Sequence, residues 1–145
     1  MEVTFRIATS DDIEDIIALT NECFDENTPV AYAKEIWQTT ANDPNTVYLN
    51  GYMGDQLVAH MRIAIIPTIY EEMGTFAILN HVCVKPTVRR QHLGTKLLDA
   101  AFAICKEHGC KAVELWSKNF REPAHAMYKK YGFEVVDAKF FSKEL

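Results

Sequence analysis

The stretch from Val84 to Leu98 reads VKPTVRRQHLGTKLL, and it joins an apolar run to an amphipathic one. The run before it, FAILNHVCV (Phe76–Val84), predicts a strand that Lys85 and Pro86 end. The run after it repeats apolar residues at helical spacing and stops at Gly109, a residue typical of helix C-termini. A strand, a loop and a helix in this order predict a return to a neighbouring parallel strand.

The other segments extend this unit into a mixed α/β fold. Alternating apolar residues predict further strands at Glu2–Ala8, TVYLNGYM (46–53), LVAHMRIAII (57–66), Lys111–Trp116, FEVV (133–136) and KFFSKEL (139–145). Helical spacing predicts helices after TSDD (9–12), at Ala31–Gln38 and at EPAHAMYKKY (122–131). We expect a single domain over residues 1–145, with a mixed, mostly antiparallel central sheet flanked by about four helices.

Composition and charge argue against several classes of protein. The net charge of −5 argues against nucleic-acid binding, although it is compatible with a cationic amine. The four cysteines, at 23, 83, 105 and 110, lack the spacing of zinc ligands, so we expect reduced thiols and no metal. The start, MEVTFRIATSDD, resembles no signal peptide, and no apolar stretch approaches the ~20 residues of a membrane span. We therefore expect a cytoplasmic protein.

The loop at the centre of the quoted stretch can bind an anion. It precedes a helix N-terminus, where unpaired N–H groups and a partial positive charge favour phosphate. Arg89, Arg90 and Lys96 add formal charge nearby. The loop matches neither the dinucleotide fingerprint nor the P-loop, because Gly94 is its only glycine. Taken alone, it could equally be a strand-to-helix turn with solvated basic residues.

Three segments together resemble the GNAT superfamily of acyl-CoA-dependent N-acetyltransferases. These are VCVKP (82–86), RRQHLGTKLL (89–98) and AHAMYKKYGF (124–133). In that family a strand ending in V-x-V-x-P leads into (Q/R)-x-x-G-x-(G/A), and an Ala-x-x-x-Tyr helix ending in Gly-Phe comes later. The resemblance covers nearly the whole chain in element order, and it implies acetyl-CoA as the acetyl donor.

The resemblance also implies a set of site residues. Backbone N–H groups from Arg90 to Thr95 would bind the pyrophosphate, the strand ending at Val84 would pair with the pantetheine amides, and the strand Lys111–Trp116 would splay away to admit that arm. Tyr128 would protonate the leaving thiolate. The implied cofactor-binding residues are Val82, Cys83, Val84, Arg89, Arg90, Gln91, His92, Leu93, Gly94 and Thr95.

Two positions depart from the family pattern. His92 occupies a glycine position, and we expect it to keep ordinary helical dihedrals and to offer its backbone N–H. Arg121 replaces a frequent asparagine seven residues before Tyr128.

Several residues are candidates for the group that takes the proton from the amine. His81 titrates in a useful range, and alternation predicts that it and Asn80 face opposite sides of the strand. Glu71, Glu72, Glu114 or a water are the other candidates. His60 and Arg62 are expected to share one face, and Asp25 and Glu26 fall where family members shape the acceptor pocket.

Two functions fit these observations. The first is transfer of acetyl from acetyl-CoA to a primary amine, on a small molecule or a protein, by direct attack. The alternative is a non-catalytic acyl-CoA-binding sensor or regulatory module. We expect no nucleic-acid or membrane partner, and the last two predicted strands offer an edge for a homodimer.

Overall fold

The computed structural model describes residues 2–89 and 92–145. The chain divides into two compact units, Met1–Leu115 and Trp116–Leu145. The single domain over residues 1–145 stays a prediction.

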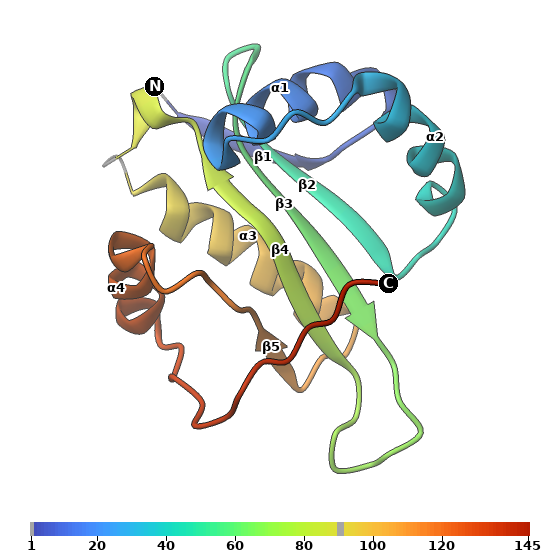
Figure 1. Ribbon diagram of the computed structural model, residues 1–145, viewed down its shortest axis with the longest axis vertical. Helices are drawn as coiled ribbons and strands as arrows, with labels where there is room; N and C mark the ends of the chain where they lie inside the picture. The colour runs from blue at the N-terminus through green and yellow to red at the C-terminus, as the bar shows by residue number, and fades with distance from the viewer. Residues whose placement is uncertain (1, 90–91) are drawn as a thin grey trace. The chain divides into compact units, whose positions relative to one another are not determined.

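The first unit is built on a five-stranded sheet in the order β1-β2-β3-β4-β5 (Figure 1). The strands are β1 (Val3–Ile7), β2 (Thr46–Met53), β3 (Gln56–Ile66), β4 (Phe76–Val84) and β5 (Ala112–Glu114). Neighbours from β1 to β4 are antiparallel, while β4 and β5 are parallel. The predicted mixed, mostly antiparallel sheet and its parallel pair are therefore confirmed.

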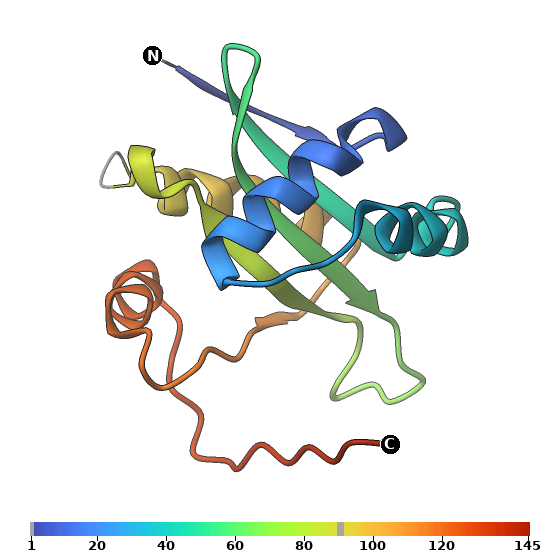
Figure 2. The same cartoon turned by 45° about the horizontal axis from the view of Figure 1, so that its top comes forward.

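Helices cover both faces of this sheet (Figures 1 and 2). Helices α1 (Ile13–Phe24) and α2 (Val30–Thr40) lie on one face, and α3 (Leu93–Glu107) lies on the other. Two short 3-10 turns, Ser10–Asp12 and Pro86–Val88, precede α1 and α3. The buried apolar residues of α1 and α3 recur at helical spacing, as the sequence predicts for helices packed on a sheet.

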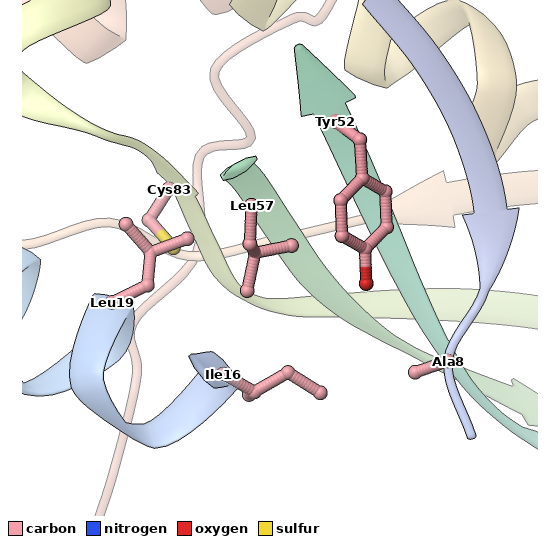
Figure 3. Close-up of a cluster of buried hydrophobic side chains, with 6 residues drawn as sticks. All are labelled: Ala8, Ile16, Leu19, Tyr52, Leu57 and Cys83. Atoms are coloured by element: carbon pink, nitrogen blue, oxygen red, sulfur yellow. The ribbon is translucent and has the colours of Figure 1, made fainter. Parts of the chain in front are cut away.

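A buried cluster holds α1 against the sheet (Figure 3). Ile16 and Leu19 of α1 pack there with Leu57, Tyr52 and Cys83 of the strands. Burying one such aliphatic side chain stabilises the fold by about 1.5–3 kcal/mol. This packing fixes the C-terminal end of α1 beside the end of β4.

Strand β4 is longer than its parallel partner, β5. Pairing with β5 covers only Phe76↔Ala112, Ala77↔Val113 and Ile78↔Glu114, whereas β4 continues to Val84. The strand predicted at Lys111–Trp116 is thus shorter than expected, and the ladder between the two strands stops, as the resemblance implies. The second half of β4 pairs with β3.

The second unit contains α4 (Glu122–Tyr131), with the bounds that the sequence predicts. Gly132 ends the helix at φ +118°, in a left-handed conformation that glycine adopts without strain. The rings of Tyr128 and Phe133 meet edge to face at 5.7 Å, and those of Trp116 and Phe140 stack at 5.1 Å.

The two strands predicted at the C-terminus are wrong. Residues 133–136 and 139–145 are all described, and none of them is in a strand. A bond of 2.9 Å from the N–H of Ala138 to the carbonyl of Val136 closes a tight turn between the two runs. Alternation specifies the faces of a strand, but a strand also needs a hydrogen-bonding neighbour, and these runs do not pair with each other.

None of the helices in the described part of the chain combines the length and the apolar character needed to cross a bilayer.

Candidate functional site

A β-bulge interrupts β4 where it has left β5. His60 of β3 pairs with Cys83, and Arg62 pairs with Asn80, so three steps along β4 match two steps along β3. His81 and Val82 of β4 therefore lie opposite the single residue between His60 and Arg62 of β3. His81 adopts φ +50°, which costs a non-glycine residue about 1–2 kcal/mol. Backbone strain of this kind often occurs at functional sites, so the side chain of His81 is a candidate functional group.

The bulge places Asn80 and His81 on the same face of the sheet, so the prediction that they face opposite sides is wrong. Arg62 donates from Nη1 to Oδ1 of Asn80 at 2.7 Å, and His81 bonds to Glu26, which follows α1. Both partners belong to the face that α1 and α2 cover. Alternation fails because the extra residue shifts the phase of side chains along the strand.

His81 and Glu26 form a hydrogen-bonded pair at the accessible rim of this face. The imidazole Nε2 lies 3.1 Å from Oε1 and 3.3 Å from Oε2 of Glu26, and the ring of Phe24 meets it edge-on at 4.8 Å. The side chain of His81 is 46% exposed and that of Glu26 is 39% exposed. Sequence reasoning named both residues but missed their pairing, because nothing local connects positions 55 residues apart.

The thiol of Cys23 lies near the end of β4, beyond the bulge. The carbonyl oxygen of Val84 accepts a hydrogen bond from Nε of Arg89 at 3.1 Å and one from the sulfur of Cys23 at 3.6 Å. A hydrogen bond with Cys83 and the positive charge of Arg89 lower the pKa of Cys23 to about 7. Cys83 itself is buried, and its pKa is raised by that same contact and by burial.

The loop predicted to bind an anion follows β4. Of its predicted residues, Arg90 and Gln91 lie outside the described residues. His92 adopts φ +59° and ψ 22°, so the prediction that it keeps helical dihedrals is wrong. The chain enters α3 through a left-handed residue, a conformation that glycine adopts without strain.

The start of α3 offers backbone N–H groups. The N–H of Lys96 bonds to the carbonyl of His92 at 3.2 Å and opens the helical ladder. The amides of Leu93, Gly94 and Thr95 precede that bond, so they are the helix-terminal donors that suit an anion.

A row of polar side chains, exposed at Arg6 and buried from Asp12 to His60, crosses the same face of the sheet as His81. Arg6 forms a bidentate pair with Asp12 at 2.8 and 2.9 Å, and the hydroxyl of Tyr52 donates to Asp12 at 2.9 Å. Asn50 bonds to the hydroxyl of Tyr52 at 3.1 Å and to Nδ1 of His60 at 2.8 Å. Asn50 is wholly buried, and the Arg6 guanidinium holds the pKa of Asp12 well below its usual range.

The chemistry of this row fixes the tautomer of His60. Because Asp12 is ionised, Tyr52 donates to it, and the amide nitrogen of Asn50 must donate to Tyr52. The amide oxygen of Asn50 then faces His60, so Nδ1 of His60 carries the proton. Burial lowers the pKa of His60 to about 3, so its ring is neutral at neutral pH.

The other candidate bases lie at the opposite end of β4. Glu72 and Glu114 line a cleft of about 370 Å³, together with Met73, Phe76, Lys111 and Ala112. Lys111 donates to the backbone carbonyl of Glu71 at 2.7 Å. Phe76 precedes His81 by five residues, or about 16 Å of strand. The structure therefore brings two of these acids together, but away from the bulge.

Tyr128 lies in α4 of the second unit, and its catalytic role stays a prediction. Arg121 immediately precedes that helix and places its guanidinium 5.1 Å from the ring centre of Phe120.

A protein from Bacillus subtilis (strain 168) shares local sequence similarity with this chain. It is named "Putative ribosomal protein bS18-alanine N-acetyltransferase" and is 33% identical over 58 residues. The match spans 40% of this chain and 38% of that curated relative.

Solved structures share the fold over almost the full length. A crystal structure described as a transcriptional regulator from Bacillus halodurans C-125 superposes with a TM-score of 0.89 at 22% identity, covering 99% of this chain and 100% of that one. A predicted acetyltransferase from Clostridium acetobutylicum, solved with acetyl-CoA, gives a TM-score of 0.79 at 20% identity, covering 98% and 96%.

The model of the acetyltransferase (GNAT) family matches residues 13–133, which span both units of the structure. The match includes the bulged strand, the anion-binding loop and α4. The chain belongs to the acetyltransferase (GNAT) family.

Proposed function

We propose that this protein transfers the acetyl group of acetyl-CoA to a primary amine by direct attack of the amine on the thioester. The observation that carries the proposal is the course of β4, which leaves β5 after Ile78 and continues through the bulge to Val84. It then enters a loop that ends at the N-terminus of α3. Family membership supports the same conclusion.

The residues of the site fit the two halves of acetyl-CoA. The pantetheine arm carries amide groups, which can continue a β-ladder along the part of β4 that β5 does not pair with. The pyrophosphate is an anion, and the amides of Leu93, Gly94 and Thr95 at the start of α3 are suited to it. Val82, Val84 and these helix-terminal amides are the proposed contacts, while Cys83 would contribute backbone only because its side chain is buried.

The demanding step is removal of a proton from the amine. An alkylamine has a pKa near ~10.4, so deprotonation at pH 7 costs about 4–5 kcal/mol, at ~1.36 kcal/mol per pH unit. The departing thiolate has a pKa near ~8.5 and needs less assistance. A base therefore matters more than an acid, and Tyr128 is proposed as the group that protonates the thiolate.

The acceptor is a primary amine of a small molecule or of a protein. The name of the Bacillus subtilis relative gives an alanine of a ribosomal protein as that protein's acceptor. Because the match covers 38% of that relative, the assay of the proposal includes both small-molecule amines and protein amines.

A thiol-release assay tests the proposal. The protein is mixed with acetyl-CoA and a panel of peptides with free N-termini, amino acids, polyamines and aminoglycosides, and free CoA is measured. We expect release that depends on one class of amine, with acetylated product confirmed by mass spectrometry. Tight binding of acetyl-CoA in calorimetry without amine-dependent release would instead identify a sensor or regulatory module.

Gly94→Val is the control for the loop. A side chain at this position would obstruct the approach of phosphate to the start of α3, so acetyl-CoA affinity should fall by at least tenfold. Release that persists in this variant at unchanged affinity would remove the loop from the site.

A further inference from the structure

We propose that His81 is the catalytic base, taking the proton from the amine at Nδ1, and that Glu26 holds its ring. This inference rests on the proposed function, because it assigns a role in amine acetylation. It begins from the bulge, which adds one residue to β4 and turns His81 toward the turn that follows α1. The bulge lies beyond Ile78, in the part of the strand that β5 leaves open.

The contact with Glu26 determines which nitrogen can act. The carboxylate lies within 3.3 Å of Nε2 through both oxygens, so in the neutral ring the proton sits on Nε2 and donates to Glu26. The lone pair is then on Nδ1. A carboxylate that fixes the tautomer of a histidine also stabilises the imidazolium formed when the free nitrogen accepts a proton.

Other titratable groups around His81 are less suited to this task. His60 is buried with a pKa of about 3, which makes it too weak a base for an ammonium group. Arg62 is a permanent cation that bonds to Asn80. Cys23, on α1, has a pKa of about 7 and donates to the carbonyl of Val84. Of these groups, His81 combines accessibility, a free ring nitrogen and a positioning partner.

The proposed step conserves atoms and charge. The ammonium group gives one proton to Nδ1 of His81, and the freed nitrogen lone pair attacks the thioester carbonyl carbon. The C–N bond forms, and the C–S bond breaks as the tetrahedral intermediate collapses. The second proton leaves the nitrogen and is taken up by the CoA thiolate directly or through Tyr128, giving the amide and CoA thiol. The imidazolium of His81 then returns its proton to solvent.

Substitutions at position 81 test the role without the usual risk of unfolding. Glycine and asparagine both tolerate φ +50°, so His81→Gly and His81→Asn should keep the bulge. We expect both to lower kcat/KM by about 10²-fold or more, the usual contribution of a general base, with acetyl-CoA affinity within threefold of the unsubstituted protein. Added imidazole should restore activity to His81→Gly. His108→Gln, at an exposed histidine that ends α3, is the matched control.

The pH profile separates a base from a structural residue. Because the Cys23 thiol, with a pKa of about 7, would add its own change of charge to the profile, the profiles are measured in a Cys23→Ala background. The rise of kcat/KM with pH that a general base produces should disappear in His81→Asn. Glu26→Gln should lower kcat/KM to a smaller extent than His81→Asn, because the ring loses the carboxylate that orients it. Glu14→Gln, at an exposed acid on α1, should match the unsubstituted profile.

The outcomes are distinct. Full activity in His81→Asn, or no rescue of His81→Gly by imidazole, overturns the assignment of His81 while acetyl transfer stands. Absence of amine-dependent thiol release by the unsubstituted protein overturns both.

Discussion

Cys23 places its sulfur 3.6 Å from the carbonyl oxygen of Val84, at the end of the strand that leads into the proposed anion-binding loop. The two residues come from α1 and β4, and the same oxygen also accepts a bond from Arg89. A reactive thiol thus lies beside the proposed path of the pantetheine arm, and it can report on occupancy of that path.

We predict that Cys23 is the first cysteine to be alkylated. Its pKa of about 7 makes half of it thiolate at neutral pH, whereas burial raises the pKa of Cys105 to about 12 and also raises that of Cys110. The rate of iodoacetamide labelling, followed by peptide mass spectrometry, should reach half its maximum near pH 7. Acetyl-CoA should slow the labelling of Cys23, and Cys23→Ala should abolish this earliest labelling. Faster labelling of Cys110 would contradict this.

We predict that Asp12 makes stability depend on acid pH. Its pKa is lowered in the folded protein, so its contribution is present above the ordinary aspartate pKa of ~3.9 and is lost as pH falls toward the folded value. Asp12→Ala should lower the free energy of unfolding at pH 7 by about 2 kcal/mol, because Arg6, Tyr52 and the N–H of Thr9 lose their acceptor. The difference between variant and unsubstituted protein in urea denaturation should shrink at pH 2.

Glu14→Gln is the control for this comparison. Its pair with Lys34 is exposed, so its effect should stay within about 0.5 kcal/mol at either pH.

We predict that His92→Gly stabilises the protein. The left-handed dihedrals cost histidine about 1–2 kcal/mol, and the greater freedom of glycine in the unfolded chain offsets part of the gain. The net increase in unfolding free energy should be about 0.5–1 kcal/mol, measured as a higher urea midpoint. Acetyl-CoA affinity should stay within threefold in both His92→Gly and His92→Ala, because the backbone is the proposed contact. Loss of binding in His92→Ala would make the imidazole itself a ligand.

We predict that Tyr128→Phe lowers turnover by at least about tenfold, because a general acid commonly contributes ~10²–10⁴. The ring contact with Phe133 should survive the loss of the hydroxyl, and acetyl-CoA affinity should stay within threefold. Tyr131→Phe on the same helix is the matched control. Unchanged turnover in Tyr128→Phe would remove this residue from the mechanism.

The elements of the fold could be predicted where their signals are local. Strand β4 begins at Phe76 and ends before Lys85-Pro86, and α4 ends at Gly132, as the sequence indicates. Hydrophobic spacing, proline and glycine act within a few residues, so they can be recognised in one chain.

The C-terminal strands and the bulge could not be predicted in the same way. The apolar runs after Gly132 have strand-like alternation, but pairing requires a partner that the runs themselves do not specify. The bulge becomes visible only when β4 is aligned with β3, since the residue with positive φ is a histidine rather than glycine or asparagine.

The site was predictable as a set of residue types but not as an arrangement. Sequence reasoning named His81, Glu26, His60 and the loop, and the structure pairs the first two and buries the third. Burial made His60 a poor base and left His81 accessible, and that difference depends on tertiary packing.

The buried row from Asp12 to His60 can transmit a change in protonation by reorientation alone. If Asp12 gained a proton, it could donate to Tyr52, whose hydroxyl could then turn toward Asn50. The amide of Asn50 would turn over and donate to Nδ1 of His60, whose proton would move to Nε2. A chemical event at the start of α1 would thus exchange the donor and acceptor nitrogens of a histidine on β3 without displacing a single backbone atom.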